Sequence, residues 1–234
     1  MKKHFAMPAK VEKRLLAWHE WAQQRPEDTP LSRPCITISR EYGCQAYPLA
    51  ESLQKHLNAQ SHEESWTLLD RLLLEKIAEE SGYSKSELNY LQQVNPVFQS
   101  MIHNFMGREH GQPFDAFHYT RKTIQYFARQ GNSIIVGRGG VCLTQDLDNV
   151  LHIRLVASTE FKLQNIMEDQ GLKINEARKL MMKKQGERDQ FILHFANIDN
   201  TDPTLYHMLI NNEKSSIEQM THTVLARLAI EKQA

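Results

Sequence analysis

The sequence lacks an excess of charge of either sign. Its 28 Lys and Arg residues balance 28 Asp and Glu residues, so the formal net charge at neutral pH is zero. Proteins that bind nucleic acid through their general surface carry a basic field, so no nucleic-acid partner is expected here. An anionic ligand would have to be held by a local cluster of basic side chains.

Cysteines and long hydrophobic runs are also scarce. The three cysteines, Cys35, Cys44 and Cys142, are widely spaced and form no C-x-x-C pair, which argues against disulfides and a structural zinc site. No stretch of about 18 apolar residues could span a membrane. Residues 1–7 are basic but lack the apolar core of a signal peptide. We therefore expect a cytoplasmic protein without a membrane partner, and no pattern indicates its oligomeric state.

Two further kinds of catalytic site have no support in the sequence. Among the 11 histidines, His103, His110 and His118 are spaced by seven and eight residues, without a nearby cysteine or an H-E-x-x-H pattern. No metal site is therefore predicted. There is no G-x-S-x-G elbow, so Ser-His-Asp hydrolysis is not predicted either.

The sequence does contain a strand–turn–helix pattern, although not a complete phosphate loop. Residues 35–38 include β-branched side chains, a polar turn with Gly43 follows, and an amphipathic helical pattern then continues to Asn58. Backbone N–H groups at such a turn, together with the helix dipole, attract phosphate. The G-x-x-x-x-G-K-[ST] pattern of nucleotide-binding loops is absent, because residues 45–47 read Gln-Ala-Tyr. On these residues alone, the turn is either a phosphate site or an ordinary strand-to-helix connection.

Strand and helix patterns alternate along the chain, which predicts an α/β fold with a five-stranded parallel sheet covered on both faces. Ligands of such sheets bind beyond the C-terminal strand ends, which places residues 39–43, 70–71 and 137–140 along one rim. The predicted strands are 35–38, 66–70, 132–136, 150–157 and 206–210. The predicted helices include 9–25, 71–81, 95–105, 114–130, 159–169, 174–195 and 215–232.

Four segments in this order resemble a known family. They are Ile38-Ser39-Arg40-Glu41-Tyr42-Gly43, Leu69-Asp70-Arg71, Ile135-Val136-Gly137-Arg138-Gly139, and Asp202-Pro203 followed by Tyr206 and Ile210-Asn211. Together they resemble the cytidylate-kinase-like family of bacteria, a branch of the P-loop nucleoside monophosphate kinases. The similarity covers about residues 34–230.

The resemblance implies a three-layer α/β/α fold of the P-loop NTPase kind, with a phosphate loop after the first strand. A helical lid that carries arginine would span residues 172–200. Residues 34–234 would form the kinase-like domain, and residues 1–33 an N-terminal helix and linker. The resemblance also implies a nucleotide substrate, ATP as the phosphate donor, and Mg²⁺.

The chain departs from the family pattern in two places. Relatives usually have a glycine-rich turn and an arginine after the Ser-Arg-Glu-Tyr-Gly run, and cytidylate kinases proper have a lysine in this loop. Here residues 44–48 read Cys-Gln-Ala-Tyr-Pro. Cytidylate kinases also have Asp-Gly-Arg-Asp after the third strand, where residues 136–139 read Val-Gly-Arg-Gly. Both departures weaken the expectation of catalysis.

Phosphoryl transfer requires positive charge around the transferring oxygens. Without a loop lysine the candidates are Arg40, Arg71, Arg138 and Arg188, because a planar guanidinium binds phosphate bidentately. A solvated surface arginine is the alternative at each position. Arg138, Arg188 and Asp70 are the predicted catalytic residues. The predicted cofactor-binding residues are Ser39, Arg40, Glu41, Tyr42, Gly43, Cys44 and Gln45, and the predicted substrate-binding residues are Asp70, Arg71, Gly137, Arg138 and Gly139.

Three of these side chains have alternative roles. Asp70 could hold the acceptor's sugar or a water on Mg²⁺, or it could cap the next helix. Glu41 could bind a metal ion or pair with Arg40, and the hydroxyl of Ser39 is a candidate Mg²⁺ ligand.

The sequence leaves two main functions open. One is an ATP-dependent kinase for a nucleoside monophosphate or a related small acceptor. The other is a non-catalytic nucleotide-binding or regulatory module whose phosphate loop has decayed. The arginines and Gly43 favour the first, and the loop substitutions favour the second.

Overall fold

The computed structural model describes residues 33–60, 65–69, 113–137 and 139–231. The helices predicted over 9–25, 71–81 and 95–105 lie outside these residues, as do Asp70, Arg71 and Arg138. The proposed boundary near residue 33 therefore stays a prediction. Within the described residues, no helix combines the length and the apolar character needed to cross a bilayer.

A parallel five-stranded sheet forms the centre of the fold, as predicted. Its strands are β1 (Cys35–Arg40), β2 (Thr67–Leu69), β3 (Ser133–Val136), β4 (Val150–Val156) and β5 (Met208–Asn211), in the order β2-β3-β1-β4-β5. The central strand β1 pairs with β3 on one side and β4 on the other. The residues after β1 and β3 therefore meet at one edge of the sheet, where sequence analysis places the ligand site.

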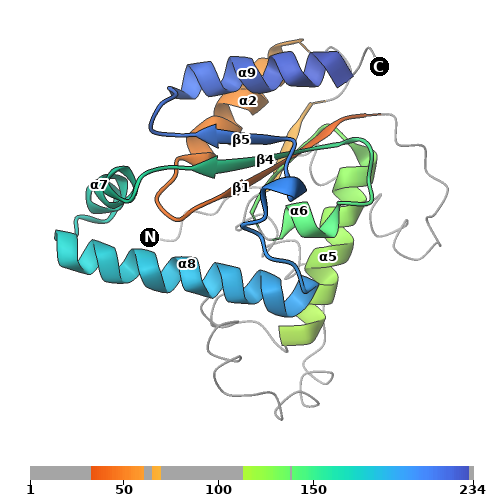
Figure 1. Cartoon of the computed structure of the whole chain (residues 1–234). Coiled ribbons are helices and arrows are strands. Elements are labelled where there is room, and N and C mark those ends of the chain that lie inside the picture. The colour runs from red at the N-terminus through yellow and green to blue at the C-terminus, as the bar shows by residue number, and fades with distance from the viewer. Residues whose placement is uncertain (1–32, 61–64, 70–112, 138, 232–234) are drawn as a thin grey trace, which may run out of the picture.

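Helices cover both faces of this sheet (Figure 1). On one face α2 (Ala46–Gln60) packs against α9 (Ile217–Glu231), and on the other lie α5 (Pro113–Gln130) and α6 (Gly140–Leu143). The core beneath α2 and α9 is apolar and includes Ile36, Ile38, Leu151 and Ile153. Alternate residues of β1 and β4 thus point into this core, while their neighbours point to the opposite face.

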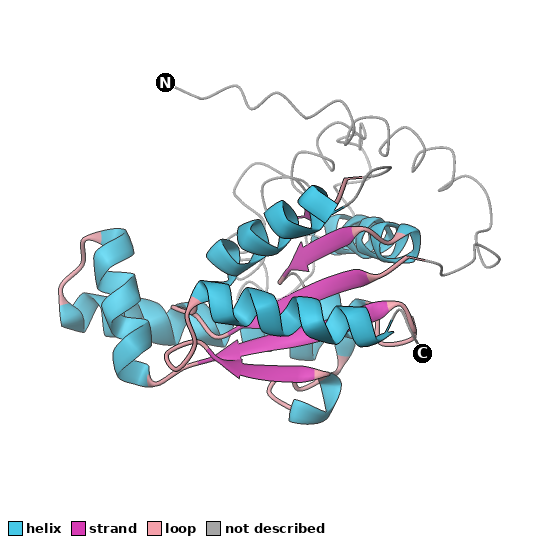
Figure 2. Ribbon diagram, turned by 90° about the horizontal axis from the view of Figure 1, so that it is seen from above, coloured by secondary structure: helices cyan, strands magenta, loops and turns pink. Residues whose placement is uncertain are grey.

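The last two helices before β5 form an extension at the sheet edge. Helix α7 (Thr159–Gln170) begins at Ser158, whose hydroxyl accepts the Phe161 N–H, and ends at Gly171 with a positive φ of 65°. Both caps were predicted from the sequence. Helix α8 (Ile174–Ala196) then returns beneath the sheet and fills most of the range predicted for a lid. Figure 2 shows the α7–α8 pair beyond one end of the strands.

One local prediction was confirmed and one was incorrect. The turn predicted over residues 137–140 is present, because the Gly140 N–H donates to the Gly137 carbonyl at 2.9 Å, and the short helix α6, which was not predicted, begins at Gly140. The fifth strand was predicted to start at residue 206, whereas Tyr206 follows a 3₁₀ turn (Pro203–Leu205) and β5 starts at Met208. Asp202 caps this turn by accepting the Thr204 N–H, so the backbone becomes extended only after it.

Candidate functional site

A cavity of about 330 Å³ lies at the carboxyl edge of β1 and β3, between the sheet and α8. Its lining comes mainly from the end of β1 with the loop after it, the turn after β3, and one side of α8. Tyr47 of α2, Val141 of α6 and Asn200 after α8 complete it. Six of the predicted site residues line it, namely Ser39, Arg40, Tyr42, Gly137, Gly139 and Arg188. Two parts of the predicted rim, residues 39–43 and 137–140, thus border one cavity, and the third part, residues 70–71, lies outside the described residues.

Arg188 is the most distinctive cation of this cavity. Its guanidinium carbon lies 4.9 Å from the centre of the Tyr42 ring, within the range of a cation–π contact. Its Nη1 is buried, and the described residues offer this atom no hydrogen-bond acceptor. Burial lowers the pKa of Arg188. The side chain is therefore held in place by a ring, with a donor group left unpaired.

The other basic residues of α8 near the cavity are already paired. Lys184 donates to Glu187 at 2.9 Å, and both residues line the cavity. Lys183 also approaches Glu187, at 4.0 Å, from an exposed position. These ion pairs compensate much of the charge of the two lysines, whereas the charge of Arg188 has no such ion pair among the described residues.

Arg40 reaches the cavity from the end of β1 and packs over Gly137. A Cβ on Gly137 would collide with the Arg40 guanidinium, and Gly137 has a positive φ of 73°. Glycine is favoured there for both reasons. The turn after β3 therefore sets the position of an arginine from β1, which explains how two of the predicted segments form one site.

The loop after β1 does not present a free set of backbone N–H groups. The Tyr42 N–H donates to Gln185 of α8 at 2.8 Å, and the Gln45 N–H donates to Asn212 Oδ1 at 2.7 Å. The Cys44 and Ala46 N–H groups donate to carbonyls of the loop itself. An ordinary phosphate loop uses such N–H groups to bind the nucleotide. Here these four N–H groups already donate to acceptors of the protein.

The remaining loop residues from the prediction lie around a second cavity of about 260 Å³. It is lined by Glu41, Gly43, Cys44 and Gln45, and also by Arg40, Tyr42 and Arg188. Glu41 forms an ion pair with Lys162 of α7 at 2.7 Å, a partner that the sequence did not reveal. Burial, and then the charge of Glu41, raise the pKa of the Cys44 thiol to about 11. Cys44 is therefore protonated at neutral pH and is not an activated nucleophile.

Beneath the first cavity lies a cluster of polar side chains on β1 and β4 that was not predicted from the sequence. His152 and Arg154 of β4 pair in register with Thr37 and Ser39 of β1. The Thr37 hydroxyl lies 2.7 Å from His152 Nδ1, and Arg154 donates to Ser39 Oγ at 3.3 Å. The sequence pattern could have revealed this cluster. Strands of a parallel sheet covered on both faces are usually apolar throughout, whereas β1 and β4 alternate polar and apolar residues.

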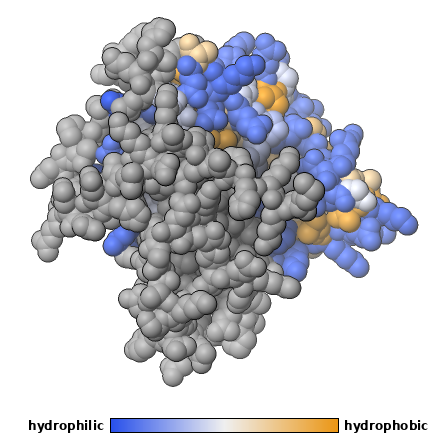
Figure 3. Space-filling view, turned by 180° about the vertical axis from the view of Figure 1, so that it is seen from behind, coloured by the Kyte–Doolittle hydropathy of each residue, from blue (hydrophilic) through white to orange (hydrophobic). Residues whose placement is uncertain are grey.

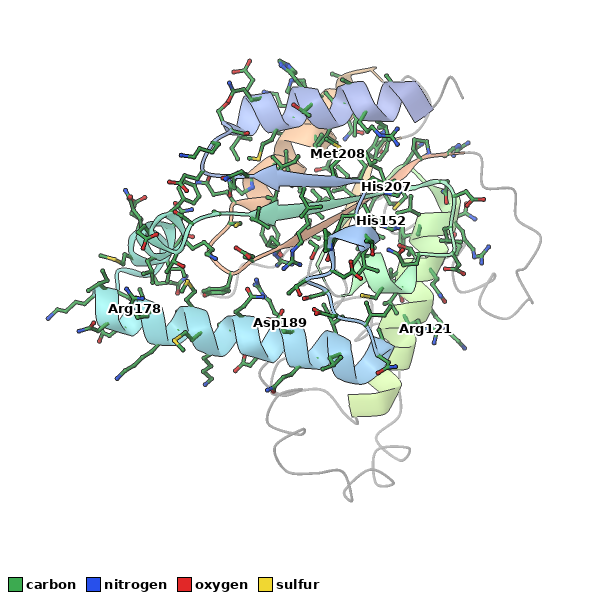
Figure 4. All side chains as sticks on the ribbon, in the orientation of Figure 1. Arg121, His152, Arg178, Asp189, His207 and Met208 are labelled. Carbon is green, nitrogen blue, oxygen red and sulfur yellow. The ribbon has the colours of Figure 1, made fainter. Side chains whose placement is uncertain are left out.

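Histidine 152 is buried beside a second histidine. The rings of His152 and His207 stack with centroids 5.3 Å apart, and Figure 4 shows the two side by side. The backbone N–H of His152 donates to His207 Nδ1 at 3.0 Å. Burial, and then the neighbouring His207, lower the pKa of His152 to about 4. His152 is therefore neutral at physiological pH.

The described residues fit phosphate better than they fit Mg²⁺. Two arginines line the cavity, and guanidinium groups are good phosphate ligands. The predicted Mg²⁺ ligand Ser39 instead accepts a hydrogen bond from the Arg154 guanidinium, a cation that a metal ion would repel. Among the described residues, no group of three His, Cys, Asp or Glu side chains could hold a metal ion.

Comparison with known proteins adds the family. The family model described as "Cytidylate kinase-like family" matches residues 35–214. A cytidylate kinase from Pyrococcus horikoshii is 21% identical over 199 residues, which cover 85% of this chain and 90% of that protein. The solved structure of an uncharacterized protein from Eubacterium ventriosum superposes with a TM-score of 0.62 at 19% identity, covering 85% of this chain and 99% of that one. These matches agree with the α/β fold predicted from the sequence.

Proposed function

Because this chain belongs to the cytidylate kinase-like family, we propose that it moves a phosphoryl group from ATP to a nucleoside monophosphate or a related small acceptor. The buried Nη1 of Arg188, left without an acceptor beside the cavity, is the observation that carries this proposal. A buried cationic donor without a partner costs free energy. A phosphate oxygen in the cavity would supply the missing acceptor.

In this proposal, Arg188 and Arg40 act on the phosphoryl group from two elements. Arg188 approaches from α8, and Arg40 from the end of β1 over Gly137. Their charges offset the negative charge on the transferring oxygens, which is the main demand of phosphoryl transfer. Arg138, predicted from the sequence, would add a third guanidinium from the turn after β3. The proposal also includes a cytoplasmic location. A reducing cytoplasm suits a nucleotide substrate and the free thiols of Cys35, Cys44 and Cys142.

One observation favours a second function, a nucleotide-binding module without catalysis. The N–H groups of Tyr42, Cys44, Gln45 and Ala46 donate to protein acceptors. A donor nucleotide would have to displace these contacts or bind without them. If it binds without them, the γ-phosphate has less backbone support and transfer could be lost while binding remains.

Phosphorus NMR of the full chain separates the two functions. The protein is mixed with MgATP and each of a panel of nucleoside monophosphates, with CMP and dCMP included. We expect ADP and nucleoside diphosphate signals that grow in proportion to protein. Arg188→Ala should reduce the rate at least about 100-fold, since a transition-state charge contact is worth on the order of 3 kcal/mol. Arg138→Ala should have a similar effect.

Arg178→Ala is the matched control. Arg178 lies on the same helix at its exposed outer end (Figure 4), so its loss should leave the rate unchanged. ATP linewidths that broaden with protein, without any product, would favour the non-catalytic module. Absence of product together with unchanged ATP linewidths would refute both proposals for these nucleotides.

A further inference from the structure

Arg154 of β4 is a buried cation that pairs with no acidic side chain of the described segments. Only 3% of its surface is exposed. Its hydrogen bonds to the described residues leave from Nη1 and end on uncharged oxygens: the Asn200 carbonyl at 2.8 Å, Ser39 Oγ at 3.3 Å and the Tyr206 hydroxyl at 3.3 Å. Among the described residues, no Asp or Glu forms an ion pair with it.

An arginine in these surroundings is unusual on physical grounds. A buried charge is ordinarily paired, because desolvation costs several kcal/mol per ion. The Tyr206 ring, whose centroid lies 5.5 Å from the Arg154 guanidinium carbon, and the Asn200 carbonyl provide partial compensation. They bring no negative charge. The exposed carboxylate of Asp199 attracts Arg154 without forming an ion pair with it, so within the described part of the chain the positive charge of Arg154 is compensated mainly by dipoles.

The position of Arg154 directs this charge at the cavity. Ser39 and Asn200, its two contacts on either side, both line the cavity. Asn200 is itself only 5% exposed, and its side-chain Oδ1 is buried without a hydrogen-bond partner among the described residues. Arg154 thus lies directly behind the wall of a site that already contains unpaired polar atoms.

Arg188 provides the second charge of the same kind. It stacks on Tyr42, and no acidic residue of the described segments forms an ion pair with it. Two guanidinium groups from α8 and β4 therefore approach one cavity from different sides. An anionic ligand in the cavity would compensate both at once, and Coulomb attraction is strong where water is excluded.

We infer that Arg154 is a positioning residue for phosphate. From its place behind Ser39, it supplies the positive charge that a lysine in the phosphate loop would otherwise supply. This inference rests on the proposed function only in taking the ligand to be a phosphate compound. It does not require that transfer occurs. Arg154 acts through its charge and through the hydrogen bonds that hold Ser39 and Asn200 in the cavity wall.

Inorganic pyrophosphate is a suitable probe, because it tests phosphate binding without turnover. Its dissociation constant is measured by titration calorimetry with the full chain and two variants. Arg154→Met removes the charge and the hydrogen bonds, whereas Arg154→Lys keeps the charge and loses the planar fork. We expect pyrophosphate binding at least about tenfold weaker in Arg154→Met and within about threefold of wild type in Arg154→Lys.

Thermal unfolding of the same variants separates charge from structure. Both substitutions disrupt the hydrogen bonds that leave from Nη1, so both should lower the melting temperature. Tyr206→Phe is a further control, because it leaves the charge of Arg154 in place but removes a hydroxyl that accepts from Arg154 at 3.3 Å and donates to Ser39 Oγ at 3.2 Å and to the Asn200 carbonyl at 2.7 Å. It should affect stability more than pyrophosphate affinity. Wild-type affinity should also fall as salt is added, and this dependence should be shallower in Arg154→Met.

Any one of three results would overturn the inference. The first is equal pyrophosphate affinity in Arg154→Met and the wild type, and the second is equal loss of affinity in Arg154→Met and Arg154→Lys. The third is no pyrophosphate binding by the wild type. Kinase failure is distinct, since it appears as the absence of NMR product while the pyrophosphate pattern persists.

Discussion

Lys184 and Arg188 lie one turn apart on α8, and both line the same cavity, but their charges have different surroundings. Lys184 is paired with Glu187, while Arg188 stacks on Tyr42 and leaves Nη1 without an acceptor. The sequence shows both as basic residues of one helical stretch. They differ because Lys184 pairs with Glu187 within α8, whereas Arg188 meets the Tyr42 ring from the loop after β1.

At the level of single residues, Gly137 determines where Arg40 can lie. Gly137→Ala should cost about 1–3 kcal/mol of unfolding free energy, because an alanine with positive φ is strained and its Cβ would meet the guanidinium. Pyrophosphate affinity should fall too, since Arg40 must move. Urea unfolding and calorimetry measure the two effects.

Gly171→Ala is the control for the backbone effect alone. Gly171 has a φ of 65°, and a Cβ there would meet nothing within 4 Å. It should lower stability by about 1 kcal/mol and leave pyrophosphate binding unchanged. Equal losses of affinity in the two alanine variants would contradict the role given to Gly137.

At the level of elements, the loop after β1 is held by three neighbours that are distant in sequence. Gln185 of α8 accepts the Tyr42 N–H, Asn212 after β5 accepts the Gln45 N–H, and Asn165 of α7 donates to the Gly43 carbonyl at 2.8 Å. A Cβ on Gly43 would also lie 2.7 Å from the Lys162 carbonyl oxygen. The loop is thus part of the packing between elements and is not an isolated turn.

The contact between Asn212 and the loop can be tested directly. Asn212 is buried, and Asn212→Ala would leave the Gln45 N–H at the start of α2 without an acceptor. The expected loss of unfolding free energy is about 1–3 kcal/mol. Asn212→Asp keeps the acceptor and places a negative charge near a helix N-terminus, so it should be closer to the wild type in urea unfolding. Its charge should nevertheless weaken pyrophosphate binding. Equal stability of the alanine variant and the wild type would show that the contact contributes nothing.

At the level of the whole molecule, the sequence predicted the architecture well because that information is local. The strand–helix alternation, the Ser158 cap and the Gly171 end are all confirmed. The partners of the site residues were not predictable in this way. Arg154 meets Ser39 only through the register of β4 on β1, and Asn200 reaches Arg154 only because the chain returns to the sheet after α8. Figure 3 shows a mainly hydrophilic surface over the described residues in view, which offers no comparable guide to the site.

The stability of the whole fold should depend on pH through His152. Its pKa is about 4 in the folded protein, against an ordinary value of 6.5, because the ring is buried beside His207. Below the ordinary value, the unfolded chain binds a proton that the folded protein does not. Unfolding free energy should therefore fall as the pH drops from about 6.5 to about 4, by on the order of 3 kcal/mol in total, and this contribution should be constant above that range.

Urea unfolding at a series of pH values measures this effect. His152→Gln should be less stable than the wild type at neutral pH, since the stacked ring is lost, but its stability should decline less steeply between pH 6.5 and pH 4. His222→Gln is the control, because His222 is exposed on α9, and it should keep the wild-type slope. A His152→Gln variant with an unchanged slope would assign the acid sensitivity to other groups, and the burial of His152 would then have no energetic consequence over this pH range. A shallower slope in His152→Gln would instead mean that protonation of His152 destabilises the sheet. The polar side chains that pair across β1 and β4, Arg154 among them, then tolerate no second positive charge at His152.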